Sequence, residues 1–399
     1  MAIEESKTLN ESLISDDEYR LVMDMMAIPG ASGSEDKVAE YITKTLEKNG
    51  ISKEWITTDD SHNKILGSGN IGNLILKLPG THGGARRLLS AHMDTVPLCV
   101  GSKPIKQGRK ISAFGSSTAL GADNRASCAV LLKTAIEVVN QNLDYPPLTF
   151  CWFIQEEIGL KGSSAVTKND LGNPELAFNW DGGKANSVVI GATGAYRIKI
   201  EITGLASHAG SAPEKGVSAI VIASRAIAEL EENGWHGKIL KGDQTGTSNI
   251  GFISSGDATN VVPDRASLKA EARSHNPEFR EQIVDEIQAA FKKAAGSVRN
   301  ISGQSGEIHF EATADYESYR LDLNEPSVQI ASQAIENIGE SREYVIADGG
   351  LDSNSLYLKG IPAVTLGVGQ MNPHTVAESL NLDDYDSACR IAFLIATGR

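Results

Sequence analysis

Residues 88–97 contain a histidine and an aspartate, His92 and Asp94, that could take part in metal binding. This stretch begins as an apolar strand and ends at Pro97, three residues after Asp94. Side chains i and i+2 of a strand share a face, so both would emerge together at the strand's carboxyl end. A histidine beside a carboxylate could bind zinc. Alone, the pair is more typical of a surface histidine and a turn aspartate before proline.

Other candidate ligands follow apolar runs or open helices elsewhere in the chain. They are Asp123 before a helix, Glu156 and Glu157 after the strand 148–155, Asp181 after an apolar run, and His374 after the strand 363–367. Each alone could be structural: Asp123 as a helix N-cap, Asp181 as a turn residue and the others as solvated side chains. Together, two histidines and several carboxylates at strand ends indicate a two-metal site, most plausibly for zinc.

Strands and helices that alternate along the chain would position these side chains. The first half has predicted strands at 52–57, 72–78 and 87–91, a continuous apolar run at 148–154 within the strand 148–155, and predicted helices at 16–26, 37–48 and 126–139. The C-terminal part has a predicted helix at 328–338, a strand at 360–366 and a helix at 383–397. This order predicts an α/β domain with a mixed, largely parallel sheet flanked by helices.

A second domain is predicted between the two parts of the first. Residues 196–202 alternate strictly between apolar and polar, which is typical of a strand with one solvated face. The elements that follow complete the order βαββαβ, which is that of a ferredoxin-like unit. We therefore expect an inserted domain at 192–317 that divides the first domain into residues 1–191 and 318–399.

The composition is that of an ordinary globular protein, with 41% hydrophobic and 22% charged residues. The formal net charge of −14 argues against nucleic acid or an anionic membrane as a partner. Residues 1–20 lack the features of a signal peptide, and no apolar run is long enough to span a bilayer. Four scattered cysteines favour reduced, mostly buried thiols and a cytoplasmic location.

Five short motifs together resemble one family. They are residues 92–97, Gly121-Ala122-Asp123, Glu156-Glu157, Asp181 and Pro373-His374. In this order they are similar to the dinuclear-zinc metallopeptidase family of aminoacylases, glutamate carboxypeptidases and tripeptidases, and most similar to its peptidase T-like branch. The resemblance covers nearly the whole chain. It implies a catalytic domain of the zinc-exopeptidase type with an inserted lid or dimerisation domain.

The resemblance also implies roles for individual residues. It implies two zinc ions per subunit (Co²⁺ or Mn²⁺ being alternatives), one held by His92, Asp123 and Asp181 and the other by Asp123, Glu157 and His374. Asp94 would orient the imidazole of His92, and Glu156 would be the general base. A shared carboxylate holds two cations roughly 3.5–4 Å apart, which activates a water between them. Adjacent residues of a strand point to opposite faces, so both glutamates can serve the site only if the chain bends after Glu156.

Residues of the inserted domain resemble substrate-binding positions of the family. His208 resembles a histidine that stabilises the oxyanion in the neighbouring subunit's site, which implies a homodimer through this domain. Asn260 and Arg273 resemble residues that bind a substrate carboxylate. The alternatives are an exposed loop histidine and a surface cation at a strand end. The glycine turn at Gly349 and Gly350 could offer backbone N–H groups to a substrate terminus.

One segment departs from the family pattern. Residues 124–127, Asn-Arg-Ala-Ser, stand where the family more often has an acidic residue, lysine and glycine, and this bulkier helix start could alter the wall of the site. The expected function is a zinc exopeptidase, an aminopeptidase or tripeptidase acting on short peptides. The alternatives are an N-acyl amino acid amidohydrolase or carboxypeptidase, a non-catalytic metal-binding scaffold, and a purely structural α/β protein.

Overall fold

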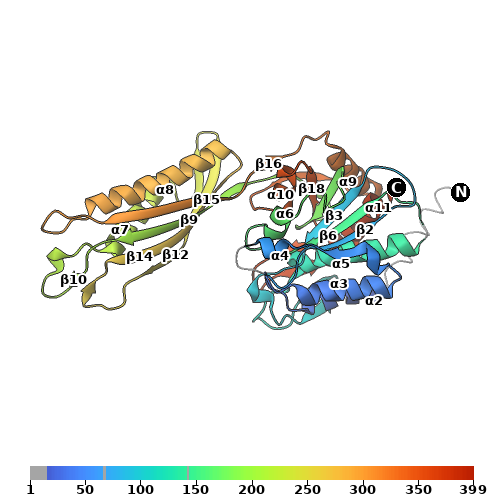
Figure 1. Cartoon of the computed structure of the whole chain (residues 1–399), viewed down its shortest axis with the longest axis horizontal. Coiled ribbons are helices and arrows are strands. Elements are labelled where there is room, and N and C mark those ends of the chain that lie inside the picture. Colours follow the sequence, from blue (N-terminus) through green and yellow to red (C-terminus); the bar gives the residue numbers. More distant parts are fainter. Residues whose placement is uncertain (1–15, 66–68, 142) are drawn as a thin grey trace. The chain divides into compact units, whose positions relative to one another are not determined.

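The computed structural model describes residues 16–65, 69–141 and 143–399, and the chain divides into two compact units (Figure 1). The first unit comprises Met1–Gly191, Arg320–Ile346 and Leu351–Arg399, and the second comprises Ala192–Tyr319 and Ala347–Gly350. Most of the N-terminal segment 1–20, for which we expect no signal peptide, lies outside the described residues. No helix in the described ranges has both the length and the hydropathy needed to cross a bilayer.

A nine-stranded sheet forms the centre of the first unit. Its four middle strands run parallel in the order β6 (Leu148–Phe153), β3 (Arg87–His92), β7 (Leu176–Trp180) and β18 (Ala363–Leu366). The outer strands are β1 (Ile56–Thr58), β2 (Leu74–Leu78), β8 (Ser187–Ala192), β16 (Tyr319–Arg320) and β17 (Glu343–Ala347). The strands β1, β2 and β8 pair antiparallel with their neighbours. The prediction of a mixed, largely parallel sheet is confirmed.

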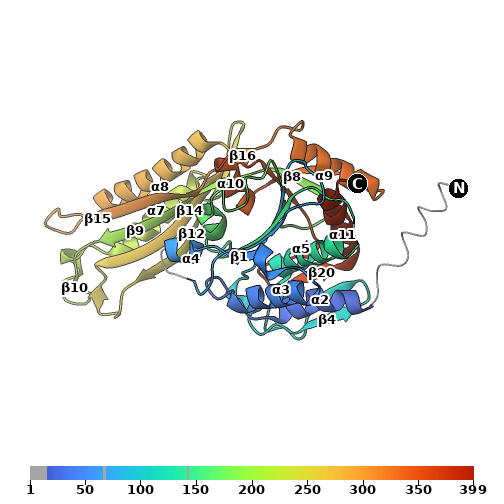
Figure 2. The same ribbon diagram turned by 45° about the vertical axis from the view of Figure 1, so that its right-hand side comes forward.

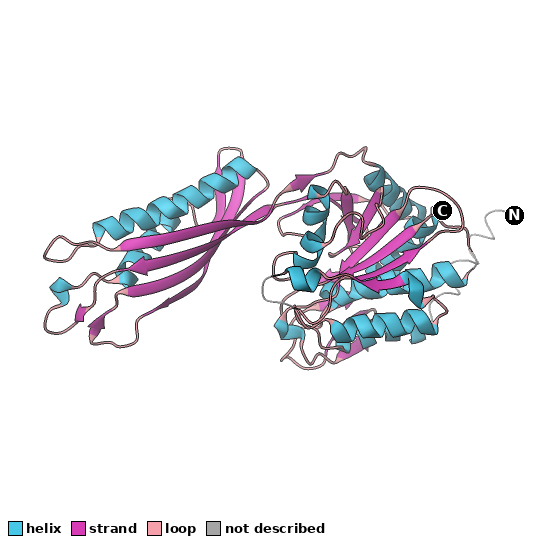
Figure 3. Ribbon diagram, viewed as in Figure 1, coloured by secondary structure: helices cyan, strands magenta, loops and turns pink. Residues whose placement is uncertain are grey.

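Helices cover both faces of this sheet (Figure 3), which explains why its four middle strands are almost entirely buried. On one face, the indole of Trp152 in β6 donates to the carbonyl oxygen of Cys128 in α5 (Ala122–Asn140) at 3.3 Å. The next residue, Phe153, lies on the other face with Leu356. The helices of this unit are α2 (Asp16–Ala27), α3 (Asp36–Lys48), α4 (Ser61–Lys64), α5 (Ala122–Asn140), α6 (Lys161–Ala165), α9 (Pro326–Asn337), α10 (Asp352–Leu358) and α11 (Leu382–Thr397). Helices α2, α3 and α11 pack against α5.

A small antiparallel sheet packs against the helices α2, α5 and α11 of the first unit. Its strands are, in spatial order, β19 (Gln370–Met371), β20 (Ser379–Asn381), β5 (Lys110–Ala113) and β4 (Pro104–Gln107). The sequence pattern predicted none of them. The strand expected at 52–57 is wrong at its start, because Trp55 N bonds to the carbonyl oxygen of Ser52 (3.1 Å) and closes a turn there. The short 3₁₀ helices of the chain are η1 (Lys53–Trp55), η2 (Pro97–Cys99) and η3 (Pro213–Lys215).

The second unit is a five-stranded antiparallel sheet with two helices on one face (Figure 2). Its elements are β9 (Gly194–Thr203), β10 (Ser207–His208), α7 (Ala219–Glu232), β11 (Gly237–Lys241), β12 (Gln244–Ser255), β13 (Val261–Val262), β14 (Arg265–Ser274), α8 (Pro277–Ser297) and β15 (Glu307–Tyr316). The order β12-β14-β9-β15 is that of the expected ferredoxin-like βαββαβ unit. Strand β11, at the edge beside β12, was not predicted.

Alternation along β9 explains the one-sided helix layer. Ile198, Ile200 and Ile202 are buried against α7 and α8, whereas Arg197 and Lys199 point to the face without helices. Asn276 is the N-cap of α8, and its side chain accepts a hydrogen bond from the backbone N–H of Phe279. The periodic apolar residues of α8 then pack on the sheet as the amphipathic pattern predicts.

Candidate metal centre

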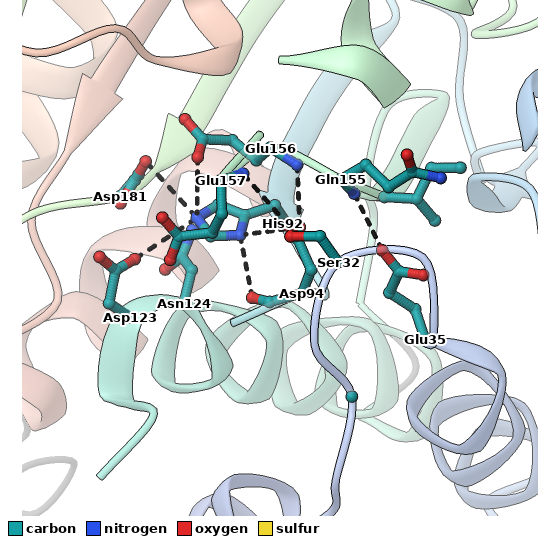
Figure 4. A network of polar contacts seen from close by, with 12 residues as sticks. Ser32, Glu35, His92, Asp94, Asp123, Asn124, Gln155, Glu156, Glu157 and Asp181 are labelled. Carbon is teal, nitrogen blue, oxygen red and sulfur yellow. Dashed lines mark hydrogen bonds and ion pairs between the residues drawn. The ribbon is translucent and has the colours of Figure 1, made fainter. Parts of the chain in front are cut away.

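His92 is the last residue of β3, and only 1% of its side chain is exposed. Its Nδ1 lies 3.2 Å from the carbonyl oxygen of Asp94 and 3.3 Å from the carboxylate Oδ1 of the same residue. The opposite ring nitrogen, Nε2, lies 3.4 Å from a carboxylate oxygen of Asp123 and 3.8 Å from one of Asp181 (Figure 4). The imidazole thus lies with Nδ1 against Asp94 and with Nε2 toward Asp123 and Asp181, and a contact of the first kind can hold such a ring in place.

Asp123 lies between the two histidines of the cluster. It is near the start of α5, where neither Asp123 nor Asn124 has helical backbone angles and the peptide bond between them is cis. The Oδ1 of Asp123 lies 3.4 Å from Nε2 of His92, and its Oδ2 lies 3.2 Å from Nε2 of His374. A carboxylate with one oxygen toward each histidine has the arrangement needed to bridge two cations.

The second histidine completes a second group of possible ligands. His374 follows β19 in a turn where its φ is 62°. Its Nε2 lies 3.1 Å and 2.9 Å from the two carboxylate oxygens of Glu157. The ligand atoms of His374, Glu157 and Asp123 all lie within 4.8 Å of one another.

Asp181 completes the first group from a neighbouring strand. It directly follows β7, and its backbone N–H donates to the carbonyl oxygen of Leu366 in β18 (3.0 Å). The ligand atoms of Asp181, His92 and Asp123 again lie within 4.8 Å of one another. The structure thus brings all five expected ligands together as two groups that share Asp123.

The two adjacent glutamates reach the cluster because the chain turns before them. Strand β6 ends at Phe153, and Gln155 has a φ of 52°. The predicted strand 148–155 is therefore two residues too long, and the bend lies at Gln155 instead of after Glu156. The backbone N–H groups of Glu156 and Glu157 donate to Oδ1 and Oδ2 of Asp94 (2.9 and 3.2 Å).

Burial and mutual repulsion dominate the electrostatics of the acids. Burial raises the pKa of Glu156 and that of Asp181 well above the usual range, and neighbouring carboxylates raise both further. Burial also opposes ionisation of Asp123, but His374 and His92 hold the pKa of Asp123 below its usual range. Several carboxylates buried together need positive charge beside them to remain ionised. Carboxylate oxygens and imidazole nitrogens are also the ligand atoms that zinc binds. The residues present therefore fit two divalent cations.

The histidines should make metal binding dependent on pH. In the metal-free protein, Asp123 and Glu157 raise the pKa of His374 to about 10, so its imidazole is protonated at neutral pH and must lose that proton to bind a cation. Raising the pH removes the competing proton. We expect apparent zinc affinity to rise by up to about tenfold per pH unit for each proton released, between about pH 6 and about pH 8. Calorimetric titrations in buffers of different ionisation enthalpy measure the release, and zinc binding without proton release would contradict this.

Two buried acids near the cluster were not singled out by the sequence pattern. Glu378 is 1% exposed, and its carboxylate accepts hydrogen bonds from the backbone N–H groups of Gly121 (2.7 Å) and Asp123 (2.9 Å), which hold the backbone of Asp123 in place. Asp352, at the start of α10, is also buried, and burial raises its pKa to about 6. The signal for Glu378 was its position four residues after His374, but an isolated loop glutamate is usually solvated.

The remaining predicted residues belong to the second unit. His208 and Asn260 lie together, because β10 pairs with β13 and the backbone N–H of Ala209 donates to the carbonyl oxygen of Asn260 (2.9 Å). The guanidinium of Arg273 donates to both carboxylate oxygens of Glu271, each at 3.0 Å.

The predicted glycine turn has a structural reason of its own. A Cβ added at Gly350 would lie 2.3 Å from the ring of Tyr316, so the close approach of this ring alone requires glycine there. At Gly349 an added Cβ would meet open space. A role in binding a substrate terminus stays a prediction for both.

Comparisons with known proteins agree with the fold. Residues 190–299 match the peptidase dimerisation domain, and residues 73–219 match peptidase family M28. The chain is 32% identical over 352 residues to the uncharacterized protein YqjE of Bacillus subtilis, covering 88% of this chain and 91% of that one. It is 30% identical over 231 residues to carboxypeptidase G2 of Pseudomonas, covering 56% and 52% respectively.

Two solved structures are similar over nearly the whole chain. A tripeptidase from Staphylococcus aureus is 28% identical with a TM-score of 0.84, and the match covers 95% of this chain and 97% of the other. Aminopeptidase PepT from Bacillus cereus is 30% identical with a TM-score of 0.79, and the match covers 95% and 98%. The chain belongs to the peptidase T-like branch of the metallopeptidase family of aminoacylases, carboxypeptidases and tripeptidases. It is a peptidase, as its motifs predicted.

Proposed function

We propose that this peptidase is a dinuclear zinc enzyme that hydrolyses short peptides. It would remove residues from their amino end, as a tripeptidase or aminopeptidase does. The observation that carries the proposal is the position of Asp123, with one carboxylate oxygen toward His92 and the other toward His374. Two cations held by these residues would lower the pKa of a bound water and so supply a nucleophile near neutral pH. The similarity to a tripeptidase and to an aminopeptidase supports the substrate class.

Glu156 is the proposed general base. It belongs to neither ligand group, yet its Oε2 lies 3.9 Å from Nε2 of His92 at the edge of the cluster. Its carboxylate would take a proton from the attacking water and deliver it to the leaving amine. Burial, which raises the pKa of Glu156, favours its holding that proton between the two transfers.

His208 is the proposed donor to the oxyanion, acting from a partner subunit of a homodimer. Its Nδ1 accepts hydrogen bonds from the backbone N–H groups of Gly210 and Ser211, both at 3.1 Å. An accepting Nδ1 places the proton of the neutral ring on Nε2, which makes that nitrogen a donor. The exposure of His208 and the match to a peptidase dimerisation domain support a role across a dimer.

Arg273 and Asn260 are the proposed contacts of a substrate carboxylate. Glu271 accepts hydrogen bonds from Nε and Nη2 of Arg273 and so holds the guanidinium in place, which leaves Nη1 for a substrate carboxylate. Backbone N–H groups at Gly349 and Gly350 would serve a substrate terminus. A cytoplasmic location accords with the cysteines, all four of which are buried and free.

A carboxypeptidase or N-acyl amino acid amidohydrolase is the second candidate, favoured by the similarity to carboxypeptidase G2. The metal donors would be the same in both. A non-catalytic metal-binding scaffold is a weaker candidate, because Glu156 is present beside both ligand groups.

A peptide-library digest read by mass spectrometry separates these functions. We expect the zinc-loaded protein to remove single residues from the amino end of tripeptides and to leave N-acyl amino acids intact. The control is the Glu156→Gln variant, which should leave the library unchanged. Trimming from the carboxyl end, or release of the acyl group, would establish the second candidate instead.

A further inference from the structure

The turn that carries Glu156 is held by three consecutive backbone N–H groups. The N–H of Gln155 donates to Oε1 of Glu35 (3.0 Å), and those of Glu156 and Glu157 donate to the carboxylate of Asp94 (2.9 and 3.2 Å). Gln155 has a φ of 52°, a conformation that residues other than glycine adopt only when their surroundings impose it. Glu35 accepts the N–H group of this strained residue, directly before the proposed base (Figure 4).

Both carboxylates are tied to one short loop, residues 28–35, which joins α2 to α3. Glu35 lies at the end of this loop and is fully buried. The hydroxyl of Ser32, in the same loop, donates to Oδ2 of Asp94 (2.6 Å). The loop therefore reaches the turn twice, once directly through Glu35 and once through Ser32 and Asp94.

Arg125 holds this loop through hydrogen bonds to its backbone and to the end of α2. Its buried guanidinium donates to the backbone carbonyl oxygens of Met25 (3.3 Å), Ile28 (3.2 Å) and Gly30 (2.9 Å). A Cβ added at Gly30 would lie 2.5 Å from Nη2 of Arg125, so the contact is close enough to require glycine. The departure from the family pattern at Arg125 thus puts an arginine on the backbone of residues 25–30.

We propose that Glu35 is a positioning residue for the reaction, which sets the place of Glu156 through the backbone N–H of Gln155. The inference rests on the proposed role of Glu156 as general base. Ser32 and Arg125 assist by holding the loop and Asp94. Without the carboxylate of Glu35, the Gln155 turn relaxes toward an ordinary φ and the side chain of Glu156 moves away from the attacking water.

The test compares Glu35→Ala with Glu35→Gln in the full-length, zinc-loaded protein. The carbonyl oxygen of a glutamine can accept the N–H groups of Gly33 and Gln155, which Glu35 accepts now through Oε1. Its amide nitrogen would replace Oε2, which has no hydrogen-bond partner among the described residues. We expect Glu35→Ala to lower kcat by ~10- to 100-fold at unchanged KM and zinc content, and Glu35→Gln to stay within ~3-fold of wild type.

A readout without activity is hydrogen exchange on the metal-free protein. Glu35→Ala should speed exchange in the segment 155–160 by at least ~10-fold and leave the strands of the second unit unchanged. The matched control is Ile42→Val, which removes one methyl group from the buried face of α3, the helix that follows Glu35. This variant should alter neither kcat nor the exchange in 155–160.

Three results would overturn the inference: wild-type kcat in Glu35→Ala, unchanged exchange in 155–160, or a Glu35→Gln variant as impaired as Glu35→Ala. A zinc-loaded wild-type protein without peptidase activity would refute the proposed function instead, while the exchange experiment would still report on the bond between Glu35 and Gln155.

Discussion

Replacing Glu156 by glutamine should lower kcat by ~10²–10⁴-fold while zinc content and KM stay near those of the wild type. Glutamine keeps the shape of the side chain but cannot take a proton from water. Glu156 belongs to neither ligand group, so both metals should remain. Its backbone N–H would still donate to Asp94, which keeps the turn in place. Steady-state kinetics on a tripeptide, with elemental analysis of the same sample, measure both quantities.

The adjacent residue provides the matched control. Glu157→Gln makes the same chemical change one position further along, but Glu157 lies with His374 and Asp123 in a ligand group. We therefore expect Glu157→Gln to lose one metal and Glu156→Gln to lose none. A Glu156→Gln variant with wild-type kcat would remove Glu156 from the mechanism, and one that loses zinc would make it a ligand.

Replacing Asp123 by asparagine should have the largest effect on metal binding. Asp123 is the one residue common to both groups, and its two oxygens face different histidines. Asparagine offers one weakly donating oxygen and no negative charge, so the affinity of both sites falls. We expect zinc content to drop from two per chain toward none, with loss of detectable hydrolysis.

Single-group variants make this prediction specific. Asp181→Asn should affect only the site with His92, and Glu157→Gln only the site with His374, so each should retain one zinc after dialysis. Two zinc ions retained by Asp123→Asn would show that this carboxylate does not bridge. A comparison of thermal melting with and without zinc checks that each variant is folded.

The residues of the two candidate ligand groups could be singled out because most of them follow an apolar run. His92 is the last residue of β3 and Asp181 directly follows β7, and these two strands are parallel neighbours in the sheet. Parallel strands end at the same edge, so residues far apart in the chain meet there. Strand β6 could also be predicted, because helices cover both of its faces and its sequence is therefore a continuous apolar run.

The elements that escaped prediction have little local signal. Strand β20 is three residues long and pairs with β5, more than two hundred residues earlier in the chain. Strand β11 is short and lies at a sheet edge, where its side chains are mostly exposed. Pairing of this kind depends on the tertiary fold more than on the propensity of either segment.

The residues that hold the site in place were also hidden in the sequence. Glu35 precedes α3 and resembles an acid that only complements the helix dipole, yet it is buried and binds Gln155. Glu378 resembles a loop acid but holds the backbone of Asp123. In both cases the partner is a backbone N–H group, and no residue type in the sequence marks such a partner.

Zinc titration of the metal-free protein tests the central claim most directly. The wild-type chain is stripped with a chelator, zinc is added in steps, and hydrolysis of a tripeptide is followed at each step. If two cations share Asp123 and both are required, activity is absent at the start and reaches its plateau at two zinc ions per chain. Full activity of the stripped protein, or a plateau at one zinc ion, would contradict the dinuclear mechanism.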